Sequence, residues 1–300
     1  MTWIPVTDTD RREMLDAIGV PDVEALFAGI PEALRMRGWE VPQGMSEMAL
    51  QAHMTALAAK NKAHLTCFLG GGYYDHYIPA AVDALSTRSE FYTAYTPYQP
   101  ECAQGTLQSI YEYQSAICRL TGLDCTNASM YDGATAMFEA ATMACRSTRR
   151  ERVVVDSTSI NPTWIKLLRT QAANLPITVE EGLQPEGAAC VIVQTPNFNG
   201  TLRDYSALSE QCKAAGALLI VVFNPIALGV LKTPGAMGAD IAVAEGQPLG
   251  LPLGFGGPYL GILAARKELI RKMPGRIVGE FGSARIRNTP IQDGMHIFGD

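Results

Sequence analysis

Apolar residues in the first hundred positions recur at helical spacing, between polar and glycine-rich segments. One run begins near Thr9 and ends at Gly19, a residue suited to a left-handed helix cap. A second helix is predicted after Asp22, and Ser46 is placed to cap a longer one. The pattern therefore predicts a helical N-terminal extension.

Glycine, proline and tyrosine interrupt this pattern over residues 70–101, which we expect to form loops around a short helix at 79–85. Helical spacing returns from Gln104 and ends at Gly122, and a further helix is expected from about Ala134 to Cys145.

Beyond Arg152 short apolar runs alternate with helical spans. Strands are predicted over 153–155, 188–194, 217–223, 241–244 and 259–264, with helices over 162–173 and 205–215. This alternation is typical of right-handed crossover units on a buried, mostly parallel sheet. The sequence therefore predicts an α/β fold without an internal linker before residue 280.

Composition narrows the classes of partner. The chain has 300 residues, of which 47% are hydrophobic and 18% charged, and a net charge of −6 with scattered lysines and arginines. Such a balance favours neither nucleic acid nor a membrane surface as partner. No signal peptide or membrane-spanning run is expected, and the seven irregularly spaced cysteines favour reduced thiols in a cytoplasmic protein.

Candidate ligand-binding residues follow the strands, because open parallel sheets bind ligands beyond their carboxyl ends. Four stretches are placed there or at a helix start: 131–135, 156–162, 223–225 and 245–248. The turn at Asp132 could hold a phosphate at a helix N-terminus, or Asp132 could simply cap that helix. Asn161 is likewise explained by capping alone.

Other chemistries lack their sequence signals. The four histidines show no metal-ligand spacing, so no metal site is expected. A GxSxG elbow, a GxxxxGK[ST] loop and a dinucleotide-binding fingerprint are all absent from the sequence.

Six motifs, in order and spacing, resemble the first subunit of the bacterial two-subunit glycine decarboxylase, the P-protein of the glycine cleavage system. They are FLGGGYYDHYIP (68–79), YTAYTPYQPE (92–101), NASMYDGATA (127–136), QTPNFNGTLRD (194–204), LGVLKTPGAMGADI (228–241) and EGQPLGLPLGFGGPYLG (245–261).

The resemblance implies a fold-type-I pyridoxal-phosphate (PLP)-dependent transferase-like large domain, with a mostly parallel sheet flanked by helices. The expected organisation is a helical extension and interface loops over 1–100, the α/β domain over 101–280, and a tail over 281–300 that does not match. The family's C-terminal small domain is then missing, and the chain is expected to be truncated after residue 280.

The resemblance also implies decarboxylation of glycine and transfer of the aminomethyl group to the lipoyl group of the H-protein. The expected partners are glycine, the H-protein and a second subunit in an α2β2 heterotetramer. The PLP is expected on that second subunit, because Gln247 replaces the lysine that forms the imine and an amide cannot form one. Asn224 replaces the acid that the family usually has at the pyridine nitrogen. The turn at Asn161-Pro162 has an asparagine where family members tend to have His-Pro.

The contribution of this chain is then expected from its tyrosine-rich loops, which would complete the partner's active site. Tyr95, Tyr98 and Gln99 are the predicted catalytic contributors, because phenol hydroxyls and an amide can bind a carboxylate or phosphate. Tyr73, Asp75 and His76 are predicted substrate-binding residues. The alternative is that these side chains only pack a subunit interface, where tyrosine is enriched.

Two alternative functions remain open on the sequence. The chain could be an inactive assembly or binding subunit, or a self-sufficient PLP enzyme that uses another lysine, for which Lys232 is nearest to the expected strands.

Overall fold

A computed structural model describes residues 5–36, 38, 40–66, 68, 70–72, 74–254, 256, 259–281 and 294–298, with the backbone alone for 281 and 294–298. The chain divides into two compact units, Met1–Cys67 and Phe68–Asp300. This division falls earlier than the boundary at residue 100 that the motifs suggest, because the loops up to that residue group with the sheet.

The first unit is a succession of short helices. They are α1 (Asp8–Ile18), the 3₁₀ helices η1 (Glu24–Phe27) and η2 (Glu32–Leu34), and α2 (Glu47–Ala58). Thr7 caps α1 in a reciprocal capping box, Gly19 closes it in the left-handed conformation, and Ser46 caps α2. The predicted caps at Gly19 and Ser46 are confirmed.

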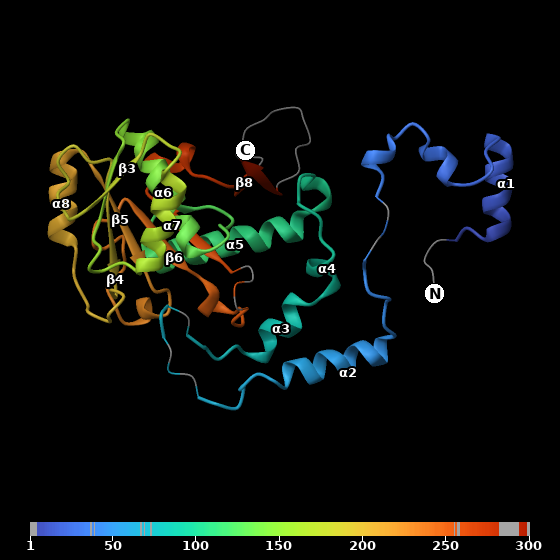
Figure 1. The fold of residues 1–300 in the computed structure, drawn as a ribbon. Helices are drawn as coiled ribbons and strands as arrows, with labels where there is room; N and C mark the ends of the chain where they lie inside the picture. The colour runs from blue at the N-terminus through green and yellow to red at the C-terminus, as the bar shows by residue number, and fades with distance from the viewer. Residues whose placement is uncertain are drawn as a thin grey trace. The chain divides into compact units, whose positions relative to one another are not determined.

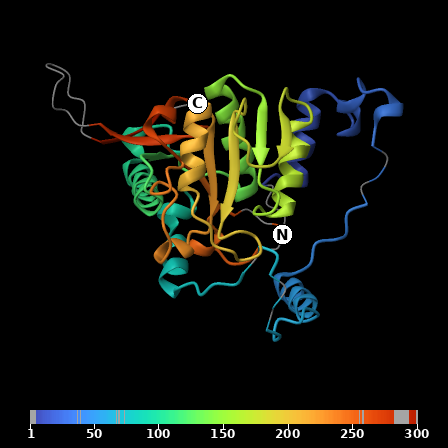
Figure 2. The same ribbon diagram turned by 90° about the vertical axis from the view of Figure 1, so that its left-hand side faces the viewer.

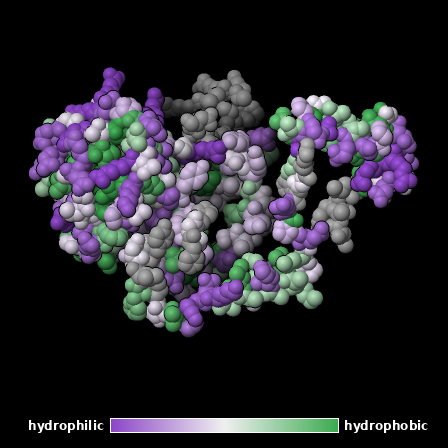
Figure 3. Space-filling view, in the orientation of Figure 1, coloured by the Kyte–Doolittle hydropathy of each residue, from purple (hydrophilic) through white to green (hydrophobic). Residues whose placement is uncertain are grey.

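None of these four elements contains a buried residue. Leu34 is 76% exposed and Met48 is 81% exposed, and Figure 3 shows green apolar patches among purple polar residues over α1 and α2. A helix whose apolar residues face water gains little from burial, so this unit lacks a core of its own.

The second unit holds a seven-stranded sheet and a two-stranded ribbon (Figure 1). The strands are β1 (Cys125–Thr126), β2 (Arg152–Val155), β3 (Thr178–Glu181), β4 (Cys190–Thr195), β5 (Leu218–Phe223), β6 (Ile241–Glu245), β7 (Gly261–Ala265), β8 (Ile277–Phe281) and β9 (Gly294–Phe298). The helices are α3 (Ala80–Ser86), α4 (Ser89–Tyr92), η3 (Pro100–Cys102), α5 (Gln104–Thr121), α6 (Gly133–Thr148), α7 (Pro162–Ala172), α8 (Ser206–Ala215), η4 (Ala227–Gly229), η5 (Gln247–Leu249) and η6 (Lys267–Lys272).

The strand order in the large sheet is β1-β7-β6-β5-β4-β2-β3. Strands β2 to β6 pair in parallel, whereas β7 runs antiparallel to both β6 and β1. The predicted mostly parallel sheet flanked by helices is therefore confirmed. The carboxyl ends of β2, β4, β5 and β6 lie at one edge, where ligands bind in folds of this kind.

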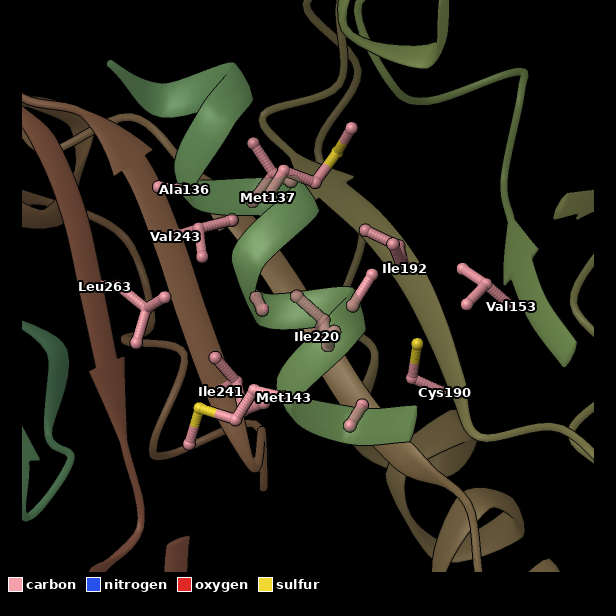
Figure 4. Close-up of a cluster of buried hydrophobic side chains, with 14 of the residues drawn as sticks. Ala136, Met137, Met143, Val153, Cys190, Ile192, Ile220, Ile241, Val243 and Leu263 are labelled. Atoms are coloured by element: carbon pink, nitrogen blue, oxygen red, sulfur yellow. The ribbon is translucent and has the colours of Figure 1, made fainter. Parts of the chain in front are cut away.

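Both faces of the sheet are buried, which explains why its central strands are continuously apolar. Met137 and Met143 of α6 pack against Ile192, Ile220 and neighbouring side chains on one face (Figure 4). The intervening strand residues point to the other face, where α8 and α5 cover them. Figure 2 shows helices on both sides of the strands.

Strands β1, β3, β8 and β9 were absent from the sequence prediction. β3 is an edge strand with the sequence TVEE, three of whose side chains are exposed, so it carries neither an apolar run nor alternation with a buried face. β1 has only two residues. Within the described ranges, every helix is too short or too polar to traverse a lipid bilayer.

Helix α5 is joined to β8 by one buried side chain. The Gln114 amide donates to the Val278 carbonyl oxygen at 2.8 Å, and its carbonyl oxygen accepts from the Val278 N–H at 2.9 Å. We expect Gln114→Met, which keeps the volume but leaves both backbone groups unpaired, to lower the free energy of unfolding by about 2–4 kcal/mol. Urea denaturation followed by circular dichroism measures the change.

The matched control is Gln108→Met on the exposed side of the same helix, where the amide contacts only Glu112. Its expected effect is within about 0.5 kcal/mol. Equal losses in the two variants would show that the buried pair at Val278 contributes nothing particular to stability.

Candidate functional site

A pocket of about 420 Å³ lies at the carboxyl edge of the parallel strands. It is lined by residues that follow β2, β4, β5 and β6, together with the start of α6 and residues 72, 74 and 76. All four stretches that the sequence placed beyond strand ends or at a helix start therefore meet around one cavity. Its size falls in the range of small-molecule sites.

The start of α6 is closed by its own cap. The Asp132 carboxylate accepts from the Thr135 N–H at 2.9 Å, and the Thr135 hydroxyl accepts from the Asp132 N–H at 3.2 Å. The capping interpretation of this turn is therefore confirmed.

Glu245, at the end of β6, joins three separate segments. One carboxylate oxygen accepts from the Gly133 N–H at 3.0 Å, and the other accepts from the N–H groups of Gln247 at 2.9 Å and Leu260 at 3.2 Å. Burial raises the pKa of Glu245, and Asp132 adds to that shift, while the three amide donors oppose it. The carboxyl group is thus fully engaged with the protein's own backbone.

Gln247 fills the position where the resemblance expects the imine-forming lysine. Its side chain is buried, with 4% of the residue exposed, and its amide group donates to the Leu251 carbonyl oxygen. A carboxamide held in this way offers no nucleophilic amine to a carbonyl compound.

Other amide side chains around the pocket also form hydrogen bonds with nearby backbone groups. The Asn224 carbonyl oxygen accepts from the N–H groups of Ile226 and Ala227, and that of Asn161 accepts from the Thr163 N–H at 2.9 Å as a helix cap. Gln194 accepts from the Asn161 N–H at 3.0 Å. These side chains hold the strand-end loops in place, so the polar lining is largely structural.

The three predicted substrate-binding residues differ in their position relative to the pocket. His76 lines the pocket, and its Nδ1 lies 2.8 Å from the Tyr74 carbonyl oxygen. Asp75 is exposed and is not among the lining residues. Tyr73 lies outside the described residues.

The predicted catalytic contributors Tyr95, Tyr98 and Gln99 do not line this pocket. All three are exposed, Tyr95 by 84%. The Arg276 guanidinium donates to the Tyr98 hydroxyl and lies 4.8 Å from the centre of its ring. Tyr98 is therefore held at the surface by a residue 178 positions later in the chain.

Several lining residues, among them Trp164, Leu167 and Gln194, lie outside the four stretches that the sequence singled out. Trp164 looked like one more apolar position of an amphipathic helix, and nothing local marks it as a pocket residue. Glu245 stood within the candidate stretch 245–248, but its contacts with Gly133 and Leu260 were not predicted, because they depend on the fold. The adjacency of an acid to the strand end was the one available signal.

Lys232, the alternative imine-forming lysine, is not among the residues that line the pocket. Its ammonium lies 3.0 Å from an Asp204 carboxylate oxygen and 2.7 Å from the Ser206 hydroxyl. An ammonium in an ion pair is a poor nucleophile, so the structure does not favour this alternative. Among the described residues, no three His, Cys, Asp or Glu side chains gather closely enough to hold a metal ion.

The sheet order, the helices on both faces and the pocket at the strand ends define the class: an α/β protein with a PLP-dependent transferase-like fold. The profile of the family described as "Glycine cleavage system P-protein" matches residues 1–287, so the match continues past residue 280. The chain belongs to the glycine cleavage system P-protein family.

Curated relatives with the name "Probable glycine dehydrogenase (decarboxylating) subunit 1" include those of Solidesulfovibrio magneticus and Geotalea uraniireducens. Each is 53% identical to this chain, over 293 and 294 residues, and each alignment covers 93% of the chain. The chain spans 66% of the length of these relatives.

A crystal structure of glycine decarboxylase (P-protein) of the glycine cleavage system, in inhibitor-bound form, superimposes with a TM-score of 0.86. The sequence identity is 41%, and the match covers 99% of this chain and 69% of the other.

The pocket does not fit PLP. It has an amide at Gln247 where an imine needs an amine, and a neutral Asn224 where a protonated pyridine nitrogen needs an anion. The helix start that could hold the phosphate is already bonded to Glu245.

Gly133 is required by the close approach of three elements. A methyl group added there would lie 2.8 Å from Trp164 Cζ2 and 2.7 Å from the Glu245 nitrogen. We expect Gly133→Ala to lower the free energy of unfolding by about 1–3 kcal/mol, because the added methyl overpacks the site. Gly105→Ala in α5, where nothing lies within 4 Å, is the control and should be neutral or stabilising. Equal effects at both positions in urea denaturation would contradict the expectation.

Asp204 reports on the ion pair of Lys232. A hydrogen bond from the Ser206 hydroxyl, and next the contact with Lys232, lower the pKa of Asp204 from 3.8 to about 2. We expect Ser206→Ala and Lys232→Met each to raise this pKa towards 3.8, which carbon-detected NMR titration of the carboxyl group measures. An unchanged pKa in Lys232→Met would mean that the ion pair does not form in solution.

Proposed function

We propose that this chain is subunit 1 of a glycine dehydrogenase (decarboxylating), the two-subunit glycine decarboxylase of the glycine cleavage system. The assembled enzyme decarboxylates glycine and passes the aminomethyl group to the lipoyl group of the H-protein. The observation that carries the proposal is a P-protein fold, matched over 99% of this chain, whose pocket presents the buried amide of Gln247 instead of an amine.

The second subunit carries the PLP in this proposal. PLP supplies an electron sink for the bond that breaks at the α-carbon. The pocket of this chain does not fit the cofactor, so its own residues serve to bind, orient and exclude water at the site of the partner. No metal is required for this chemistry.

Two features support an association with the second subunit. The helices of the first unit leave apolar side chains such as Phe27 and Met54 about half exposed, although a monomeric protein rarely leaves an apolar patch of this kind in water. The relatives named "subunit 1" imply a second subunit, with which we propose an α2β2 assembly.

The six described cysteines are free thiols, which supports a cytoplasmic location.

Tyr95, Tyr98 and Gln99, in the loop that follows α4, are the proposed contribution to the partner's site. Arg276 fixes the Tyr98 ring and hydroxyl, which leaves little orientational freedom to lose when a ligand binds. Tyr95 and Gln99 are exposed beside it in sequence, and a hydroxyl and an amide there can bind the carboxylate of glycine or a cofactor phosphate.

The test is reconstitution of the chain with the second subunit, PLP and a lipoylated H-protein, followed by glycine-dependent bicarbonate exchange. We expect exchange well above that of the second subunit alone. Binding to the second subunit without any gain in exchange would instead support an assembly role for this chain.

Within the reconstituted enzyme we expect Tyr95→Phe and Tyr98→Phe each to lower kcat/KM by about tenfold, the value of one hydrogen bond to a charged group. The control is Tyr92→Phe, a tyrosine 81% exposed at the end of α4. If all three variants retain full exchange, the phenol hydroxyls only pack an interface.

A further inference from the structure

Two carboxylates of the protein itself occupy the start of helix α6. Glu245 accepts from the N–H of Gly133, the first residue of the helix, and Asp132 accepts from the N–H of Thr135 in the same turn. The free N–H groups of a first helical turn are the donors that a bound phosphate would use. Two of these donors are therefore committed to internal anions.

The surroundings supply no compensating positive charge. None of the described residues that line the pocket is lysine or arginine, and His76 is the one lining side chain that can become a cation. An entering phosphate would face Asp132 and Glu245 without a lysine or arginine among the described lining residues to offset them. It would also have to displace one oxygen of Glu245 from the Gly133 N–H, while the other oxygen is held nearby by the N–H groups of Gln247 and Leu260.

The closeness of the packing reinforces this block. The absence of a side chain at Gly133 is what lets Trp164 and the end of β6 approach the helix start. Little space then remains between the first helical turn and the Glu245 carboxylate for a tetrahedral anion.

We infer that Glu245 and Asp132 determine the ligand charge that this pocket accepts, acting as built-in anions at α6 that exclude phosphate and phosphorylated ligands, PLP included. The sequence change from lysine to Gln247 removes the covalent bond to a cofactor. The two carboxylates remove its non-covalent anchor as well. This inference extends the proposal that the cofactor belongs to the second subunit. Its role in the assembled enzyme rests on that proposed function, whereas the exclusion of phosphate from the pocket does not.

The experiment uses the isolated chain and inorganic phosphate as the probe. Phosphate is titrated into the wild type and into Asp132→Ser/Glu245→Ser, in which the serine introduced at position 132 keeps the helix cap and both negative charges are gone. Calorimetry and the thermal midpoint report binding. We expect no saturable binding by the wild type up to about 10 mM and at least about tenfold tighter binding by the double variant.

A spectroscopic readout places the ligand in the pocket. The chain has three tryptophans, so Trp3→Phe/Trp39→Phe leaves Trp164, beside the site, as the single tryptophan, which is excited selectively at wavelengths where tyrosine does not absorb. In this background PLP should quench the double variant more strongly than pyridoxal does, whereas the two compounds should act alike on the wild type.

The control for net charge is Glu151→Ser/Glu186→Ser, which also removes two carboxylates; both residues are exposed and precede the amino ends of β2 and β4, at the opposite edge of the sheet. It should not gain phosphate binding. If Asp132→Ser/Glu245→Ser does not fold, Asp132→Asn/Glu245→Gln removes the same charges with almost unchanged volume.

Saturable phosphate binding by the wild type, with a preference for PLP over pyridoxal at Trp164, would overturn the inference. A folded, uncharged variant that gains no phosphate binding would overturn it too, because the carboxylates would then not be what closes the pocket. Neither measurement involves glycine exchange, so a failure of this inference can be distinguished from a failure of the proposed function.

Discussion

The carboxylate of Glu245 is the contact on which the arrangement of the site depends. It receives hydrogen bonds from the start of α6, from the turn after β6 and from Leu260 before β7. Residues 133 and 245 are 112 positions apart. A single half-buried acid thus fixes the helix start relative to two neighbouring strands, and its partial burial is tolerated because three backbone donors replace its lost hydration.

The same saturation of polar groups gives the pocket its character. In an enzyme that binds a cofactor, strand-end side chains are left free for the ligand, whereas here Gln247, Asn224 and Asn161 are bonded to nearby backbone. Side chains that are hydrogen-bonded to the backbone in this way hold the strand-end loops in place and leave fewer polar groups for a ligand.

Two exposed features of the chain contrast with this internally hydrogen-bonded pocket. The helices of the first unit bury none of their residues, and Tyr98 is fixed by Arg276 at the surface of the second. Pre-orientation of an exposed aromatic ring lowers the entropy lost on association.

The sequence by itself determined the central helices and strands, because continuous apolar runs such as Leu218–Phe223 and a helix end at Gly122 are local signals. It also determined that position 247 holds an amide. Only the tertiary structure decided that Glu245 meets Gly133 and that Tyr98 meets Arg276, since hydrogen bonds between distant residues follow from strand order and register. The edge strand β3 was hidden for the same reason: its pairing with β2, rather than its own polar sequence, makes it a strand.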